Sequence, residues 1–298
     1  MRLRVVHRTT YEYDEPVTTS HHEVHLTPRD GGGQSCLSHA VTIRPTPTSI
    51  RARTDFFGNR TVYFAIQESH RSLAIVAESE VHVEGRSSSL LLDRTPWEDV
   101  RDLVARDRRP EMVNAYSFVF ESPYVSPEPA LAELARPSFV PRRPLLDAVL
   151  DLTERLHAEF AFDPGATRVS TPLSDVLRDR RGVCQDFAHV GIGCLRAVGL
   201  PARYVSGYLL TAPPPGVPRL TGCDASHAWV STFLPGVGWI DFDPSNNLLP
   251  DGGHVVVAHG RDYGDVTPVR GVILGGGRPS LGVSVDVVAL EEGGRGAR

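Results

Sequence analysis

Arg180-Arg181-Gly182-Val183-Cys184-Gln185-Asp186-Phe187-Ala188-His189 is the stretch that decides how the second half of this chain folds. Gly182 favours a tight turn, because a residue without a Cβ atom tolerates backbone angles that other residues avoid. After the turn, small and apolar residues recur at helical spacing, namely Phe187, Gly191, Cys194, Leu195 and Val198. Gly199 then stands where glycine commonly ends a helix. The pattern predicts a buried helix with Cys184 as its first or second residue.

The predicted position of Cys184 would make its thiol reactive. A thiol at a helix N-terminus lies near the positive end of the helix dipole and near free backbone N–H groups, and both favour the thiolate. The same N–H groups could stabilise an oxyanion formed during attack on a carbonyl. Cys184 is therefore a candidate nucleophile, and the rest of the chain must supply its base.

Two histidines are candidates for that base. His189 lies five residues further along the same helix, which turns its side chain roughly 140° away from Cys184. His227 is better placed, because it opens a predicted strand where polar groups gather at the strand end. A hairpin at Pro235-Gly236-Val237-Gly238 then brings Asp241 and Asp243 back beside His227. Alternation along a strand puts both carboxylates on one face, so spacing alone does not choose between them.

A zinc site is the alternative interpretation of the same residues. Cys184, His189, Cys223 and His227 could supply four ligands in two pairs of short spacing. Structural zinc ligands usually lie on turns, however, and an apolar helix is a poor place for such a pair. The sequence therefore favours a site without metal. Cys194 lies within the apolar stripe of the helix and is predicted to be a core residue.

Composition places the chain among globular proteins. It has 298 residues, 41% hydrophobic and 22% charged, with a net charge of −5. All 31 basic residues are Arg, and no basic tract interleaved with aromatics suggests nucleic-acid binding. The first eight residues alternate like a strand and lack the apolar region of a signal peptide. Four cysteines in a chain of this length do not form a disulfide framework, so a reduced, cytoplasmic protein without membrane association is expected.

Composition also divides the chain. Short β-branched runs separated by turn residues predict a β-sandwich-like domain over residues 1–92. Seven prolines mark 93–143 as a connecting region with short helices around Trp97–Val104 and Pro129–Leu134. Helices followed by antiparallel strands predict an α+β core over 144–290, with strands at Val255–Ala258 and Val269–Leu274. The Gly- and Arg-rich residues 291–298 are expected to be a flexible tail.

Several of these motifs together resemble one family. They are Gly182 to His189, Gly199-Leu200-Pro201-Ala202-Arg203, Ser226-His227-Ala228-Trp229, Phe242-Asp243-Pro244, Arg261-Asp262-Tyr263 and, near the N-terminus, Leu26-Thr27-Pro28-Arg29. The set resembles the bacterial transglutaminase-like proteins over nearly the whole chain. The resemblance implies a papain-like core, helices packed on an antiparallel sheet, behind an N-terminal β domain. It also implies a triad of Cys184, His227 and Asp243.

The resemblance further bounds the oxyanion site. Phe162 stands where a tyrosine is expected in many relatives, so a tyrosine hydroxyl is not available there. Gln185 and the backbone N–H of Cys184 are the candidate oxyanion donors, and Trp229 is a further candidate for oxyanion or substrate contact.

The expected activity follows from the triad. Thiolate attack on an amide forms an acyl-thioester, with no cofactor and no metal, and a protease or amidase acting on a peptide or amide substrate is the favoured prediction. Transfer of the acyl group to an amine, as in a transglutaminase, is the first alternative. A non-catalytic binding module is the second. An intact triad argues against the latter, because binding alone would not require all three residues.

Overall fold

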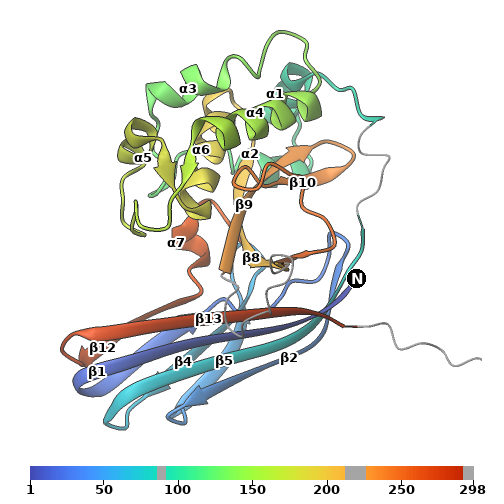
Figure 1. Cartoon of the computed structure of the whole chain (residues 1–298). Coiled ribbons are helices and arrows are strands. Elements are labelled where there is room, and N and C mark those ends of the chain that lie inside the picture. Colours follow the sequence, from blue (N-terminus) through green and yellow to red (C-terminus); the bar gives the residue numbers. More distant parts are fainter. Residues whose placement is uncertain (86–91, 212–225, 291–298) are drawn as a thin grey trace, which may run out of the picture.

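The computed structural model describes residues 1–85, 92–211 and 226–290. Figure 1 shows two layers: a large sheet below, and above it the helices that cover a smaller sheet. The expected tail at 291–298 and Cys223 lie outside the described residues. Mixed helices and antiparallel sheets of this kind confirm the predicted α+β class.

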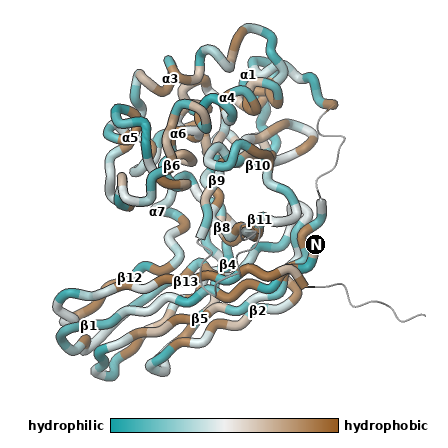
Figure 2. The backbone as a smooth tube through the Cα atoms, in the orientation of Figure 1, coloured by the Kyte–Doolittle hydropathy of each residue, from teal (hydrophilic) through white to brown (hydrophobic). Residues whose placement is uncertain are grey.

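The long strand β1 organises the large sheet. β1 (Arg2–Val24) pairs along its first half with β5 (His70–Val83) and along its second half with β4 (Arg60–Ile66). β2 (Gln34–Arg44) extends the sheet beyond β5, and β3 (Ser49–Thr54) extends it beyond β4. Figure 2 shows polar and apolar segments alternating along these strands. The two halves share a hydrophobic core that includes Val24, Ile43, Phe64, Ile66, Leu73 and Ile75, as expected for a sandwich-like domain.

The C-terminal strands correct the predicted domain boundary. β12 (Val269–Gly275) and β13 (Pro279–Leu290) do not join the sheet of the second domain; both pair antiparallel with β1. The predicted core over 144–290 is therefore too long at its C-terminal end. β1 offers an unpaired edge that these strands fill, and chain order alone could not reveal which of two sheets a strand completes.

The second layer is built around α6 (Cys184–Ala197). This helix packs against β9 (Ser226–Leu234), a central strand of the antiparallel sheet β10-β9-β8-β11. The other strands of that sheet are β8 (Ala202–Leu209), β10 (Gly238–Phe242) and β11 (His254–Gly260). The two short strands β6 (Ala161–Phe162) and β7 (Arg181–Gly182) pair parallel beside the start of α6.

The remaining helices surround α6. They are α1 (Trp97–Arg106), α2 (Pro110–Tyr116), α3 (Pro129–Ala135), α4 (Leu145–Glu159), α5 (Leu173–Asp179) and α7 (Tyr263–Val266). The predicted helices at Trp97–Val104 and Pro129–Leu134 are confirmed as α1 and α3. Among the described helices, none has both the length and the apolar composition needed to cross a membrane.

Glycines set how closely α6 approaches its neighbours. A Cβ atom on Gly191 would lie 3.1 Å from Val230 of β9, and one on Gly193 would lie 2.7 Å from Leu131 of α3. Gly199, with φ of 80°, follows the helix in the left-handed conformation. The Gly199 N–H donates to the Arg196 carbonyl and the Leu200 N–H to the Leu195 carbonyl, a Schellman ending. The predicted helix and its stop are therefore confirmed.

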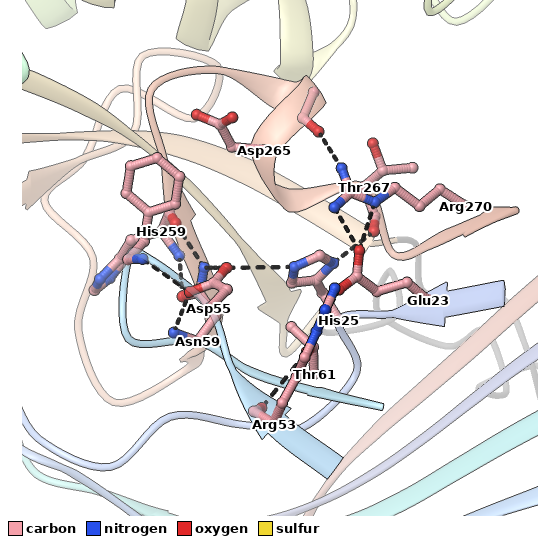
Figure 3. A network of polar contacts seen from close by, with 12 residues as sticks. Glu23, His25, Arg53, Asp55, Asn59, Thr61, His259, Asp265, Thr267 and Arg270 are labelled. Atoms are coloured by element: carbon pink, nitrogen blue, oxygen red, sulfur yellow. Dashed lines mark hydrogen bonds and ion pairs between the residues drawn. The ribbon is translucent and has the colours of Figure 1, made fainter. Parts of the chain in front are cut away.

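A shared core and a polar network join the two layers. Val5 of β1 and Val285 of β13 pack in one hydrophobic cluster with residues of the upper layer. Figure 3 shows the polar part: the Asn59 side chain of the lower layer bonds the backbone of His259 of β11 in both directions. Within the large sheet itself, Glu23 accepts from Arg53 and Arg270. The position of the upper sheet is thus fixed by the N-terminal domain.

Candidate active site

Cys184 is the first residue of α6 and is half-buried. The turn before it is held by Asp186, whose carboxylate accepts the Val183 N–H at 2.8 Å and the Thr167 hydroxyl at 2.6 Å. Gly182 is required for a different reason from the one predicted: a Cβ atom there would collide with the Asp186 side chain. Gly182 is not one of the glycines whose backbone has a positive φ. Close approach, not turn geometry, thus explains this glycine.

His227 meets Cys184 because α6 packs across β9. Its Nε2 lies 2.6 Å from Oδ2 of Asp243, and the Cys184 side chain lies close enough to raise the pKa of the ring. Since Asp243 occupies Nε2, Nδ1 is the nitrogen left for the thiol. Burial alone would lower the pKa of His227, but the hydrogen bonds and charges of Asp243 and Cys184 outweigh it and raise the pKa to about 10. The ring is therefore protonated at neutral pH.

Asp243 directly follows β10 and is completely buried. One oxygen accepts the Ser245 hydroxyl at 2.7 Å and the backbone N–H groups of Ser245 and Asn246. The other oxygen accepts from His227 and from the Asn246 side-chain amide at 2.8 Å. Burial alone would raise the pKa of Asp243, but the hydrogen bond from His227, followed by that of His254, holds it well below its usual range. The carboxylate is thus a fixed negative charge behind the imidazole.

Asp241 of β10 contacts a different residue of β9 from the one that Asp243 contacts. Its Oδ2 accepts the indole N–H of Trp229 at 2.9 Å. Trp229 is fully buried, and its ring stacks beside the His227 ring with centroids 5.9 Å apart. The structure therefore brings Asp243, and not Asp241, to His227, as the family resemblance implies. The interpretation of Trp229 as an oxyanion or substrate contact is wrong for this conformation, because its only polar group is occupied and it has no exposed surface.

The Gln185 side chain is held less firmly than the Trp229 indole, so it remains more available to an oxyanion. Its side-chain amide donates to the Val169 carbonyl at 3.3 Å, a long hydrogen bond. The Cys184 N–H is the first of the helix, where no acceptor exists within the helix itself. Both remain predicted oxyanion donors. Phe162 of β6 pairs with Gly182, is 56% exposed and gives this edge of the site an apolar surface.

His254 and Asn246 were not found from the sequence. His254 opens β11, and its Nε2 lies 3.3 Å from the same Asp243 oxygen that contacts His227. Its ring also meets Trp229 edge to face, with centroids 5.2 Å apart. The Asn246 amide reaches both Asp243 and His227 Nε2. Two signals were available: a histidine opening a strand, as His227 does, and an asparagine three residues after the aspartate.

The predicted zinc ligands are not supported as a set. His189 is buried, its Nε2 accepts the Tyr263 N–H at 3.2 Å, and its ring packs between Tyr124 and Tyr204. Cys223 lies outside the described residues. A different group, His227, Asp243 and His254, has its ligand atoms within 4.8 Å of one another.

That group is better described by hydrogen bonds than by metal coordination. Ligand atoms about 2.0–2.2 Å from one tetrahedral zinc stand roughly 3.3 Å apart. His227 and Asp243 are closer, at 2.6 Å, which is a charge-assisted hydrogen-bond distance. A metal would therefore have to push the pair apart before it could bind.

The other described cysteines have different environments. Cys194 is fully buried, and burial raises the pKa of its thiol to about 12. Cys36 is half-buried like Cys184, and burial raises the pKa of its thiol too. Neither of these two thiols has a histidine as a described hydrogen-bond partner. Only Cys184, among the described cysteines, is placed for activation.

Comparisons with known proteins identify the family. The model of the bacterial transglutaminase-like N-terminal region matches residues 3–82, and that of the transglutaminase-like superfamily matches 133–244. A Mycobacterium tuberculosis protein is 41% identical over 97% of this chain and 93% of its own length. The chain belongs to the transglutaminase-like superfamily. The second match contains Cys184, His227 and Asp243, so all three fall within the region that defines the superfamily.

Two further relatives extend the comparison. A Cytophaga hutchinsonii protein, whose crystal structure is described as that of a proposed cysteine protease, superposes with a TM-score of 0.74. It is 22% identical and covers 98% of this chain and 92% of its own, so the transglutaminase-like chain shares its whole fold. A protein-glutamine gamma-glutamyltransferase of Pseudomonas aeruginosa is 32% identical over 41% of this chain, but over only 18% of its own length.

Proposed function

We propose that this protein is a cysteine-nucleophile enzyme that cleaves amide bonds through an acyl-thioester, as a protease or amidase. One observation carries the proposal: His227 hydrogen-bonds the buried Asp243 and lies close enough to Cys184, at the start of α6, for the thiol side chain to act on the pKa of the ring. This is the order of nucleophile, base and orienting carboxylate that acyl-transfer catalysis needs. Membership of the transglutaminase-like superfamily supports it.

The chemistry follows from the positions of the three groups. The thiolate of Cys184 attacks the amide carbonyl, and the oxyanion lies near the first N–H groups of α6. The imidazolium of His227 donates its proton to the leaving amine, the C–N bond breaks, and a thioester on Cys184 remains. His227, now neutral, takes a proton from water, whose oxygen attacks the thioester and releases the acid. Asp243 keeps the ring oriented and stabilises its charged form throughout.

Acyl transfer to an amine is the alternative. Both reactions share the first half, and they differ only in whether water or an amine attacks the thioester. The similarity to the Pseudomonas aeruginosa gamma-glutamyltransferase, over 41% of this chain, favours this candidate. We favour hydrolysis because it needs no second organic substrate and therefore no second binding site.

A non-catalytic binding module is a less satisfactory account. Burying the Asp243 carboxylate costs free energy, which hydrogen bonds from Ser245, Asn246, His227 and His254 must offset. A groove used only for binding gains nothing from a buried charge aimed at a histidine that in turn meets a thiol. The free-energy cost of burying Asp243 is therefore explained by catalysis and not by binding alone.

Trapping the acyl-enzyme tests the proposal. The protein would be mixed with a panel of acylated peptide amides, with and without dansylcadaverine as the amine. The reaction would be quenched in acid, and the mass of the intact protein would be measured by mass spectrometry. Cys36→Ala is the matched control, because Cys36 is also a half-buried thiol. We expect an adduct on wild type and Cys36→Ala but not on Cys184→Ala, and free acid as the product. Dansylated product in place of acid would establish the transferase alternative, and turnover by Cys184→Ala would overturn the mechanism.

A further inference from the structure

A cavity lies between the two layers, lined by residues of β8, β10 and β11 and by residues of the N-terminal domain. Its volume is about 940 Å³, and its walls include the Gly31–Gly33 loop, Trp239 and His254. Neither Cys184 nor His227 lines it. It is therefore separate from the candidate active site, although His254 contributes to both.

Arg203 of β8 is the most unusual residue in this cavity. Its guanidinium lies over the Trp239 ring, 4.2 Å from the centroid. Its Nε is shielded from solvent without a hydrogen-bond partner, and no carboxylate among the described residues forms an ion pair with it. Burial lowers the pKa of Arg203 to about 9. A shielded cation without a counter-ion is costly, so such a residue is normally paired.

Two further groups lie in the electrostatic range of Arg203. Arg29 donates to the carbonyl of Phe57 and to the side chain of Asn59, both neutral, and it too has no ion pair among the described residues. His259 is anchored by its backbone to Asn59, as Figure 3 shows, while its ring Nδ1 is shielded and without a partner. Burial, and then the charges of Arg203 and Arg29, hold the pKa of His259 well below its usual value. Arg203 and His259 thus each have a shielded nitrogen without a partner, and Arg29 has only neutral acceptors.

Five carboxylates also line the cavity, those of Asp30, Glu84, Asp93, Asp241 and Asp251. Asp30 and Asp241 are among those that already have other partners. Asp30 pairs with Arg60 at 3.1 Å, and Asp241 accepts from Trp229. Asp241 still favours the charged form of Arg203 electrostatically, although it makes no ion pair with it. Arg203 and Arg29 are therefore the two cationic residues of a cavity whose other charged lining residues are acidic, and neither has an ion pair among the described residues.

We propose that this cavity binds a small organic anion whose carboxylate or phosphate group is held by Arg203, Arg29 and His259. Guanidinium groups match both oxyanions with paired, charge-assisted hydrogen bonds. The volume exceeds that of a bare oxyanion and falls within the range typical of small-molecule sites. The Trp239 ring, which lines the cavity beside Arg203, offers an apolar surface to the rest of the ligand. This inference goes beyond the proposed activity and does not depend on it.

Trp239 gives the test a built-in reporter. Intrinsic fluorescence would be titrated with inorganic phosphate and, separately, with glutarate, each against sodium chloride of equal ionic strength. We expect a saturable change with at least one probe, and the probe with the lower midpoint identifies the preferred oxyanion. Trp239→Phe should lose the signal. Arg203→Gln should raise the midpoint at least tenfold, whereas Arg94→Gln, a surface arginine paired with Asp147, should not.

The proposal is overturned if neither probe saturates, if chloride gives the same response, if Trp239→Phe keeps the signal or if Arg203→Gln binds like wild type. Should Arg203→Gln fail to fold by circular dichroism, Arg29→Gln replaces it with the same criterion. The readout uses no enzymatic turnover. Its failure would therefore leave the proposed amide chemistry untouched, and failure of that chemistry would leave the anion site standing.

Discussion

Two aspartates two residues apart at the end of β10 have the same chemistry and opposite surroundings. Asp243 is fully buried and contacts His227, whereas Asp241 is half-buried and contacts the Trp229 indole. His227 and Trp229 are also two residues apart, on the neighbouring strand. The sheet thus aligns two acceptor–donor pairs side by side, one able to move a proton and one able only to hold a ring in place. Residue spacing predicts both pairs and cannot say which is reactive.

Replacing each carboxylate in turn tests most directly which of the two aspartates takes part in catalysis. Asp243→Asn should keep the fold and lower turnover by about 10⁴-fold, the loss seen when the equivalent aspartate is changed in serine proteases. Asp241→Asn keeps an acceptor for the Trp229 indole and removes only the charge of that hydrogen bond, so a loss of about 2–10-fold at most is expected. Steady-state kinetics on both variants, with circular dichroism to confirm folding, makes the measurement. Equal losses, or a larger one from Asp241→Asn, would mean that the wrong carboxylate has been assigned.

The protonation of His227 sharpens the same comparison. Its pKa is raised to about 10, so the ring should stay protonated from pH 6.5 to nearly pH 10, where an ordinary histidine is neutral. Asp243→Asn removes the charge that holds the proton, and the pKa should fall toward 6.5. Asp241→Asn should leave it high. Ring-proton NMR titration, with His227→Gln to assign the signal, distinguishes these cases. A neutral His227 at pH 8 in the wild type would contradict the ion-pair description.

Replacing His254 should lower turnover less than replacing Asp243 does. Its effect should arise from the loss of its contact with Asp243. His254→Gln can still donate to Asp243 but lacks the imidazole that packs on Trp229, whereas His254→Ala leaves that Asp243 contact empty. Loss of a hydrogen bond to a charged group is worth about 1.5–3 kcal/mol, so His254→Ala should lower kcat roughly 10–100-fold. His254→Gln should recover most of it, and KM should change little in either variant. An unchanged kcat for His254→Ala would show that this contact is only structural.

The smallest expected effect concerns metal. Chelators should leave turnover unchanged, because the proposed mechanism uses a thiolate and no metal. Elemental analysis of the untagged protein should find far less than one zinc per chain. About one zinc per chain together with unfolding in chelator would instead support a metal site and overturn the thiol mechanism.

What the sequence could predict depended on local pattern. The α6 helix, its glycine stop and the pairing of Cys184 with His227 followed from periodicity and from the rule that strand ends gather polar groups. Sheet membership was different: residues 269–290 complete the N-terminal sheet, and no pattern along the chain records which edge they reach. His254 and Asn246 were missed for the same reason, since their role exists only once β11 and the turn after β10 converge on Asp243.

Glycine and tryptophan show a second limit. Gly182 was interpreted from the commonest use of glycine, a special backbone angle, but here it makes room for the Asp186 side chain. Trp229 was interpreted as a donor to substrate, but the fold gives its N–H to Asp241. In both cases the residue type narrowed the options, and a contact from another part of the chain chose between them.

Selective alkylation of Cys184 tests the central claim most directly. The wild-type protein would be treated near pH 7 with limiting iodoacetamide, and labelling of each cysteine would be followed by peptide mapping. Activation by His227 and Asp243 predicts that Cys184 reacts well before Cys36, its half-buried counterpart, while Cys194 stays unmodified. It also predicts that Asp243→Asn slows Cys184 toward the rate of Cys36. If Cys184 reacts no faster than Cys36 in the wild type, or at the same rate in Asp243→Asn, the three residues do not act as one nucleophilic unit.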